Sequence, residues 1–153
     1  MRDPTTWYVI ADGGQARVVR KRDGQDVFDT EREFVSAEIH SRTHDMGAER
    51  PGRVHESVGP ASHAAEPRQD LHQADKQNFV GEVARMLNEA DAHQEFDRLI
   101  LVAPAHALAW LNDALHAGTK QKVAAELQKD LTKTPNSELG EHLAHLSFRP
   151  SAL

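Results

Sequence analysis

The sequence predicts a single α/β domain built on a mixed β-sheet. Two apolar segments, residues 6–11 and 99–103, have the composition of strands that are covered on both faces. Amphipathic helical patterns lie between and after these segments, and helices that return the chain between buried strands produce layered α/β domains. A chain of 153 residues is large enough for one hydrophobic core of this kind. We therefore expect residues 1–153 to form one domain.

Three strands that form an antiparallel meander are expected at the N-terminus. They occupy residues 6–11, 16–22 and 25–35, and the sequences DGGQ and RDG separate them. In the third strand, Phe28 and Phe34 fall in the same phase of a two-residue pattern and should face the same side of the sheet. The third strand is also the most polar of the three, so we expect it to be the most exposed.

A long loop is expected at residues 36–69, followed by a helix. The segment has three prolines, three glycines and no lasting periodicity, and loops of this length are usually functional or disordered. Asp70 is expected to cap the helix, with Gln73 completing a capping box, and the helix should run to about Asp91. Its apolar stripe consists of Phe79, Val80, Val83, Leu87 and Ala90, and its expected solvent-facing residues are Asp75, Lys76, Glu82 and Arg85.

The C-terminal half continues with a strand and a second helix. Residues 96–104 read as an inner parallel strand, because an uninterrupted apolar run ends at Pro104. The helix that follows should present Leu108, Leu111 and Leu115 on one face and end at Gly118.

The last part of the chain is harder to assign from its pattern. Residues 123–131 fit helical spacing and strand alternation equally well. A final helix is expected to begin at Thr134, as its cap, with Pro135 in the first helical position. Its apolar side consists of Leu139, Leu143 and Leu146.

Composition excludes several classes of function. A net charge of -6 and an isoelectric point of about 5.9 argue against a general nucleic-acid-binding protein, because binding along phosphates requires clustered lysine and arginine. The absence of cysteine excludes disulfides, thiolate nucleophiles and cysteine-ligated metals. The first residues lack the pattern of an export signal, and no segment is long and apolar enough to cross a bilayer. We expect a cytoplasmic protein without membrane contact.

One short motif suggests chemistry. The turn after the first strand reads Asp12, Gly13, Gly14 and Gln15, and Gly-Gly-Gln is the tripeptide with which class I release factors cleave peptidyl-tRNA. The glycines also have a structural explanation, since Asp-Gly and Gly-Gly supply the positive φ angles of two-residue hairpin turns. Because they precede a strand and not a helix, they lack the helix N-terminus of a phosphate-binding loop.

Five segments together carry a family resemblance. They are WYVIADGGQARVV, ERPGRVHESVGPASHAAEP, FVGEVARMLNEA, FDRLILVAPAHALAWLNDAL and LQKDLTK. In this order they resemble the bacterial host attachment proteins, a family that is similar to the middle domain of archaeal and eukaryotic release factors and to the ribosome-rescue protein Pelota. The resemblance implies a three-layer, ribonuclease-H-like fold in the order β-β-β-α-β-α-β-α, with residues 123–131 as the last strand.

The resemblance also implies where a catalytic Gly-Gly-Gln would lie. In release factors the tripeptide is in the long loop after the third strand, and the corresponding residues 36–69 contain Gly52 and Arg53 but no such tripeptide. Here Gly13, Gly14 and Gln15 are in the first hairpin. We therefore expect no peptidyl-tRNA hydrolysis.

The long loop contains the one local cationic cluster. Its candidate contact residues are Arg50, Gly52, Arg53, His55 and His63. Glutamates alternate with them, so a neutralised solvent loop and an anion or RNA contact remain equally open. Together with the resemblance, the cluster favours a non-enzymatic module that contacts a ribosome, RNA or protein partner through residues 36–69.

The alternative function is a metal-dependent hydrolase of phosphodiesters or esters that uses Asp12 and the loop histidines. Two-metal chemistry needs further acids near Asp12, and the nearest candidates, Asp97 and Asp113, lie at the start of a strand and on a helix. The pairs His40–His44 and His142–His145 have helical spacing without a third ligand or an HExxH motif. We therefore expect no catalytic residues, no metal site and no cofactor, and interpret Asp12 as a turn residue that bonds its own backbone.

Overall fold

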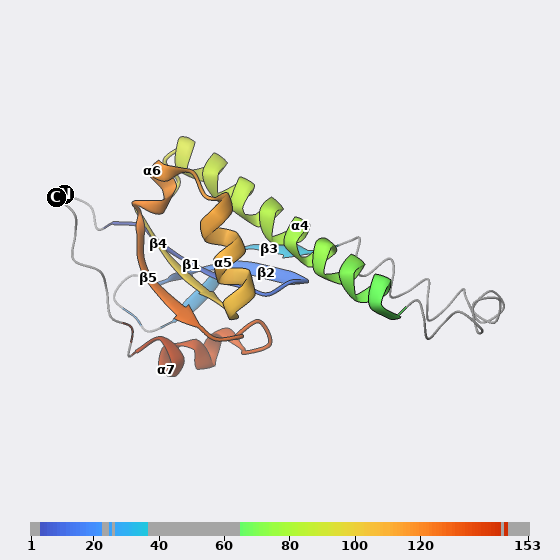
Figure 1. Ribbon diagram of the computed structural model, residues 1–153. Helices are drawn as coiled ribbons and strands as arrows, with labels where there is room; N and C mark the ends of the chain where they lie inside the picture. Colours follow the sequence, from blue (N-terminus) through green and yellow to red (C-terminus); the bar gives the residue numbers. More distant parts are fainter. Residues whose placement is uncertain (1–3, 23–24, 26, 37–64, 145, 147–153) are drawn as a thin grey trace.

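The fold is a mixed five-stranded sheet with helices on both faces (Figure 1). The computed structural model describes residues 4–22, 25, 27–36, 65–144 and 146, with side chains of the first long helix described from residue 72 onward. The strands are β1 (Thr6–Ala11), β2 (Gln15–Lys21), β3 (Phe28–Val35), β4 (Arg98–Ala103) and β5 (Val123–Gln128), in the spatial order β3-β2-β1-β4-β5. β1, β2 and β3 pair antiparallel, whereas β4 pairs parallel with β1 and β5. The expected α/β class and mixed sheet are confirmed.

The helices lie in two layers. They are α4 (Ala65–Ala92), α5 (Ala105–Ala114), α6 (Ala117–Lys120), the 3-10 turn η3 (Asn136–Glu138) and α7 (Leu139–Leu143). α4 and α5 pack on one face of the sheet, while the chain from Leu131 through α7 packs on the other (Figure 1). Along the chain the elements follow one another as β1-β2-β3-α4-β4-α5-α6-β5-η3-α7, so α6 and η3 are present in addition to the expected elements.

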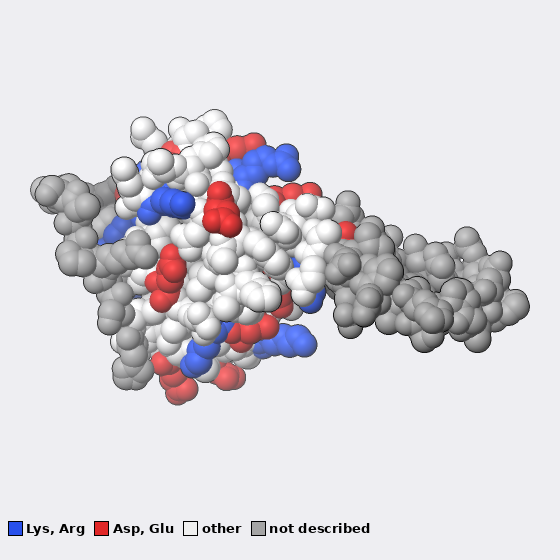
Figure 2. Space-filling view, viewed as in Figure 1, with Lys and Arg blue, Asp and Glu red and all other residues white. Residues whose placement is uncertain are grey.

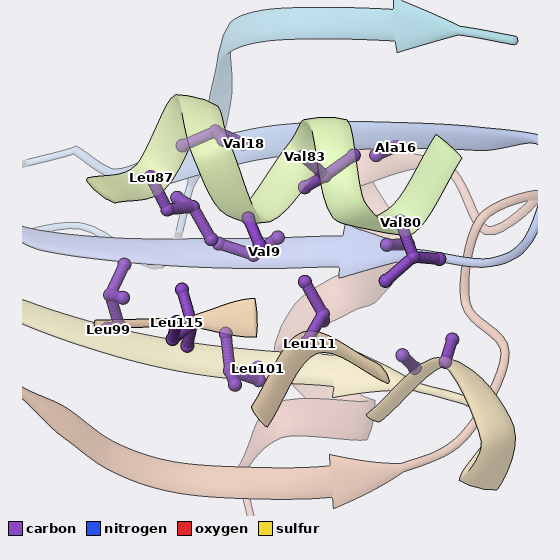
Figure 3. Packing of buried hydrophobic residues seen from close by; sticks show 14 of the residues in the cluster. Val9, Ala16, Val18, Val80, Val83, Leu87, Leu99, Leu101, Leu111 and Leu115 are labelled. Atoms are coloured by element: carbon purple, nitrogen blue, oxygen red, sulfur yellow. The ribbon is translucent and has the colours of Figure 1, made fainter. Parts of the chain in front are cut away.

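The central strands are buried on both faces. Val9 of β1 points toward α4 and α5, together with Leu99 and Leu101 of β4 (Figure 3). Their neighbours Ile10 and Ile100 belong to the opposite cluster, and all five side chains are fully buried. Burial on two sides explains why these segments are apolar without alternation, as the sequence predicted.

A bulge in β3 overturns the expectation that Phe28 and Phe34 share a face. Glu31 is an extra residue in the pairing of β3 with β2, and such an insertion reverses the alternation of side chains beyond it. Phe28 therefore packs in the cluster beneath α7, whereas Phe34 packs against the cluster beneath α4.

The first helix differs from the prediction in its start and in one buried residue. It begins at Ala65, so Asp70 is inside the helix and is not its cap. Pro67 lies in the first turn, where a missing backbone N–H costs no helical hydrogen bond. The predicted apolar stripe is buried, but Asp75, expected in solvent, is only 5% exposed, because it precedes Phe79 by four residues and so lies on the same stripe.

α5 ends at Ala114, four residues before the predicted stop at Gly118, which lies inside α6. Asn88 of α4 provides the reason. Its side-chain amide donates to the carbonyl of Ala114 at 3.2 Å, and its oxygen accepts the N–H of His116 at 2.9 Å. A side chain from another helix therefore satisfies backbone groups that a helix end leaves without partners.

The ambiguous segment forms a strand from Val123 to Gln128, as the family resemblance implied, and Leu131 is buried beyond its end. The final helix starts as a 3-10 turn in which Pro135 occupies the cap position, one residue later than predicted for the cap. Its predicted apolar side is correct, since Leu139 and Leu143 are buried.

The β1–β2 turn packs directly beneath α4, and this contact explains its first glycine. A Cβ on Gly13 would lie 2.6 to 2.9 Å from the Cγ, Cδ and Cβ atoms of Lys76, whereas a Cβ on Gly14 would meet only Asp12 Oδ1 at 3.9 Å. Neither glycine has a left-handed φ, so the prediction of positive φ angles is wrong. Gly13 is required for close approach.

An ion pair joins α4 to the start of β5. Asp91 accepts hydrogen bonds from Lys122 and from the Thr119 hydroxyl, the latter at 2.9 Å. Burial alone would raise the pKa of Asp91, but the hydrogen bonds from Lys122 and Thr119, together with nearby positive charge, outweigh it and lower the pKa. This carboxylate contributes to stability in its ionised form.

We expect Gly13→Ala to lower the free energy of unfolding by about 1 to 3 kcal/mol, because the new methyl group overlaps Lys76 close to the helix backbone. Gly14→Ala is the matched control and should stay within about 0.5 kcal/mol of the wild type, since its Cβ has room. Urea unfolding measures both. Equal effects of the two substitutions would contradict the packing explanation.

We expect Asp91→Asn to lower the free energy of unfolding by about 1 kcal/mol at pH 7, because Lys122 loses its partner in a partly buried place. The difference from the wild type should persist down to about pH 4 and shrink as the pH falls through the lowered pKa of Asp91. Asp29→Asn, which removes the exposed pair with Arg22, should cost less. Urea unfolding across this pH range checks both variants, and a constant difference down to pH 2 would refute the assignment.

Candidate functional site

A cleft of about 670 Å³ opens where the parallel strands β1, β4 and β5 end. Four pieces of chain line it: the β1–β2 turn, the start of α5, the N-terminal half of α4 and the residues that follow β5. Carboxyl ends of parallel strands meet at one edge of a sheet, and ligands of α/β proteins bind in the crevice outside them. The cleft is the candidate functional site.

The turn that forms one wall of the cleft is organised by Asp12. Its Oδ1 accepts the backbone N–H groups of Gly14 at 2.8 Å and Gln15 at 2.9 Å, and its own N–H donates to the Gln15 carbonyl at 2.9 Å. The expectation that Asp12 bonds its own turn is therefore confirmed. Gln15 is half-buried and lines the cleft, so all four predicted turn residues lie at this site.

Thr132 connects the turn to the chain after β5. Its hydroxyl lies 3.0 Å from Asp12 Oδ2 and 2.6 Å from Asp130 Oδ1, and its N–H donates to Asp130 at 3.0 Å. Thr132 is buried. Both carboxylates at the cleft thus already accept hydrogen bonds from the protein.

Arg17 of β2 holds the chain that follows β5 in place through its side chain. Its guanidinium donates to the Thr132 carbonyl at 2.8 Å, to the Thr134 carbonyl, and to the Asn136 side chain at 3.1 Å. Burial lowers the pKa of Arg17, and the charge of Glu33 opposes that effect. The chain after β5 is therefore held to β2.

The start of α5 forms the opposite wall. Pro104 occupies the cap position and provides no side-chain hydrogen bond, and the first helical hydrogen bond runs from the Leu108 N–H to the Pro104 carbonyl at 2.9 Å. The N–H groups before Leu108 therefore have no acceptor within the helix. Gly13 and Gly14 lead into the strand β2, as the sequence predicted, and the helix N-terminus that lines the same cleft belongs to α5, from a distant part of the chain.

The cleft also contains side chains that were not identified from the sequence as site residues, among them Lys76, His106, Trp110 and Lys133. The rings of His106 and Trp110 lie 5.9 Å apart on one side of α5. A binding site is expected near residues that directly follow an inner parallel strand. His106 could have been found in this way, because Pro104 marks the end of such a strand. Lys76 and Lys133 carry no comparable signal, since each is one lysine in a polar stretch.

The predicted contact residues Arg50, Gly52, Arg53, His55 and His63 lie outside the described residues. Ser36, the last described residue before that segment, lies next to the cleft, because its N–H donates to the carbonyl of Gly14 at 2.9 Å. Asp97 lies at the other end of β4, where it accepts the N–H of Thr5.

Among residues 4–36 and 65–146, as far as they are described, no group of three histidine, aspartate or glutamate side chains is arranged to hold a metal ion. His142 contacts Lys129 at 3.4 Å, and its predicted pair member His145 is outside the described part. No described helix has both the length and the apolar character that a bilayer requires.

Comparison with known proteins identifies the family. A search of curated proteins finds no match to this sequence. The model of a protein family described as required for attachment to host cells matches residues 7–143, a range that begins in β1 and ends with α7 and includes every wall of the cleft. The chain belongs to the family of proteins required for attachment to host cells.

Proposed function

We propose that the protein acts by binding and not by catalysis, as an interaction module that contacts a ribosome, RNA or protein partner through residues 36–69. The observation that carries this proposal is the way the Gly-Gly-Gln turn is held. Gly13 packs against Lys76, Asp12 bonds Thr132, and Gly14 accepts a hydrogen bond from Ser36. A glutamine in such a turn lacks the reach that peptide release at the ribosome requires.

We further propose a ribonuclease-H-like fold and a relationship to the middle domain of release factors. The strand order β3-β2-β1-β4-β5, with three antiparallel strands followed by two parallel ones, supports the fold assignment. A translation-associated role in the cytoplasm follows from that relationship. Function belongs to sites and not to folds, so the relationship by itself transfers no chemistry.

The hydrolase alternative has less support. Asp12 accepts two backbone N–H groups of the turn through Oδ1, Asp130 accepts the N–H of Thr132, and the Thr132 hydroxyl lies within hydrogen-bond distance of both carboxylates. A two-metal mechanism needs several carboxylates free to coordinate the metals. The described residues contain no such cluster.

In a peptide-release assay with programmed ribosomes, we expect no release above background from the wild type, and the same result for Gln15→Ala. The reason is that the turn is fixed between α4 and the chain after β5. A class I release factor is the positive control. Release that depends on Gln15 would overturn the proposal.

Cosedimentation tests the contact through residues 36–69. We expect the protein to sediment with ribosomes at low salt and Arg53→Glu to lose most of this association, because contacts between exposed charges weaken with charge reversal and with salt. Arg85→Glu makes the same charge change on the exposed side of α4 and should retain the association. Failure of the wild type to associate at any salt concentration would exclude a ribosomal partner.

A further inference from the structure

We propose that the cleft binds a nucleotide, with the phosphate between Lys76 and Lys133 and the base against Trp110. The described residues that line the cleft lie outside residues 36–69, so a ligand there is separate from the interaction role proposed for that segment. The cleft volume of about 670 Å³ falls within the range of sites that enclose small organic ligands.

The topology places the cleft where nucleotide sites form in open α/β sheets. β1 has an antiparallel neighbour on one side and a parallel neighbour on the other. After β1 the chain turns directly into β2, whereas after β4 it continues into α5 over one face of the sheet. The connections therefore diverge between β1 and β4 and leave a crevice at the carboxyl ends of both strands.

Two lysines of the cleft can hold an anion. Lys76 comes from α4 and Lys133 from the chain after β5, and no ion pair of either occurs among the described residues. The carboxylates that share the cleft, Asp12 and Asp130, instead accept hydrogen bonds from the turn and from Thr132. Two lysines that have no ion-pair partner in the described part of the chain are suited to a phosphate, which carries several strong acceptor oxygens.

The aromatic side chains of the cleft favour a nucleotide over a phosphate ester that has no base. Trp110 is half-buried on α5, beside the His106 ring and between the cleft and the outer groove of α4 and α5. Pro104 and Ala107 extend this wall with apolar surface. Stacking of a base on an aromatic ring is a main contribution to nucleotide recognition, and Trp110, which lines the same cleft as the two lysines, can provide it here.

Calorimetric titration of the full-length protein tests the proposal, with the four ribonucleoside monophosphates, adenosine and inorganic phosphate as probes. We expect at least one nucleoside monophosphate to bind at least about tenfold more tightly than adenosine or phosphate alone, since each provides only half of the contacts. The Lys76→Gln, Lys133→Gln double variant should lose at least about tenfold in affinity, because each lysine contributes a charged hydrogen bond. Glutamine retains the Cβ, Cγ and Cδ atoms with which Lys76 packs on Gly13.

Lys120→Gln is the matched control, since this exposed lysine of α6 does not line the cleft. It should bind like the wild type. Equal affinities of the wild type and the double variant, or phosphate binding as tight as that of the nucleotides, would overturn the proposal.

Tryptophan fluorescence gives an independent readout. Trp7 is buried beside Phe96, so a change in emission on binding should come from Trp110 and should vanish in Trp110→Phe. Binding without any change in emission would place the ligand elsewhere and refute the proposed pose. If an RNA trinucleotide displaces the bound nucleoside monophosphate, the natural ligand is the terminal nucleotide of an RNA chain. If it does not, the natural ligand is a free nucleotide. Both results would retain the site.

Discussion

The hydrogen bonding of β1 to β2 on one side and to β4 on the other determines where the candidate site lies. β1 runs antiparallel to β2 and parallel to β4, and the tight turn begins directly after the pairs Ile10–Val102 and Ala11–Ala16, close to the end of β4. Since the side chains of both central strands are buried on both faces, neither strand can shift by one residue without exposing apolar surface. The turn and the start of α5 therefore face each other.

The chain after β5 is held against this arrangement by side chains that reach across the sheet edge. Arg17 bonds the carbonyls of residues 132 and 134, and Asp12 lies 3.0 Å from the hydroxyl of Thr132. Each contact joins residues more than 100 positions apart in the sequence. The walls of the cleft thus come from four separate segments whose relative positions are fixed by packing and hydrogen bonds, as a preformed site requires.

Sequence patterns predicted the parts of this structure that depend on local rules. The buried runs of β1 and β4 and the apolar stripes of α4 and α5 follow from periodicity, and the hairpin follows from a turn sequence between two strand-like segments, although its glycines do not have the predicted positive φ angles. Several errors depend on residues elsewhere in the chain: the bulge at Glu31, the end of α5 set by Asn88, and Gly13 beneath Lys76. The start of α4 and the burial of Asp75 are local errors. The cleft was missed for the same reason, because only Asp12 to Gln15 form a local motif and the other walls come together through the fold.

An acidic protein can still bind a nucleotide, because the repulsion from distant carboxylates is screened by salt while the attraction of a lysine in contact with a phosphate is much less affected. At physiological ionic strength, exposed charges farther apart than about 8 Å are largely screened, while a lysine in direct contact with a phosphate is screened little. Figure 2 shows charges of both signs scattered over the visible described surface, with no basic stripe along which a long strand could lie. With a net charge of -6, the chain as a whole repels a polyanion. A ligand with one phosphate needs only Lys76 and Lys133, which makes a single nucleotide a better match to this surface than an extended nucleic acid.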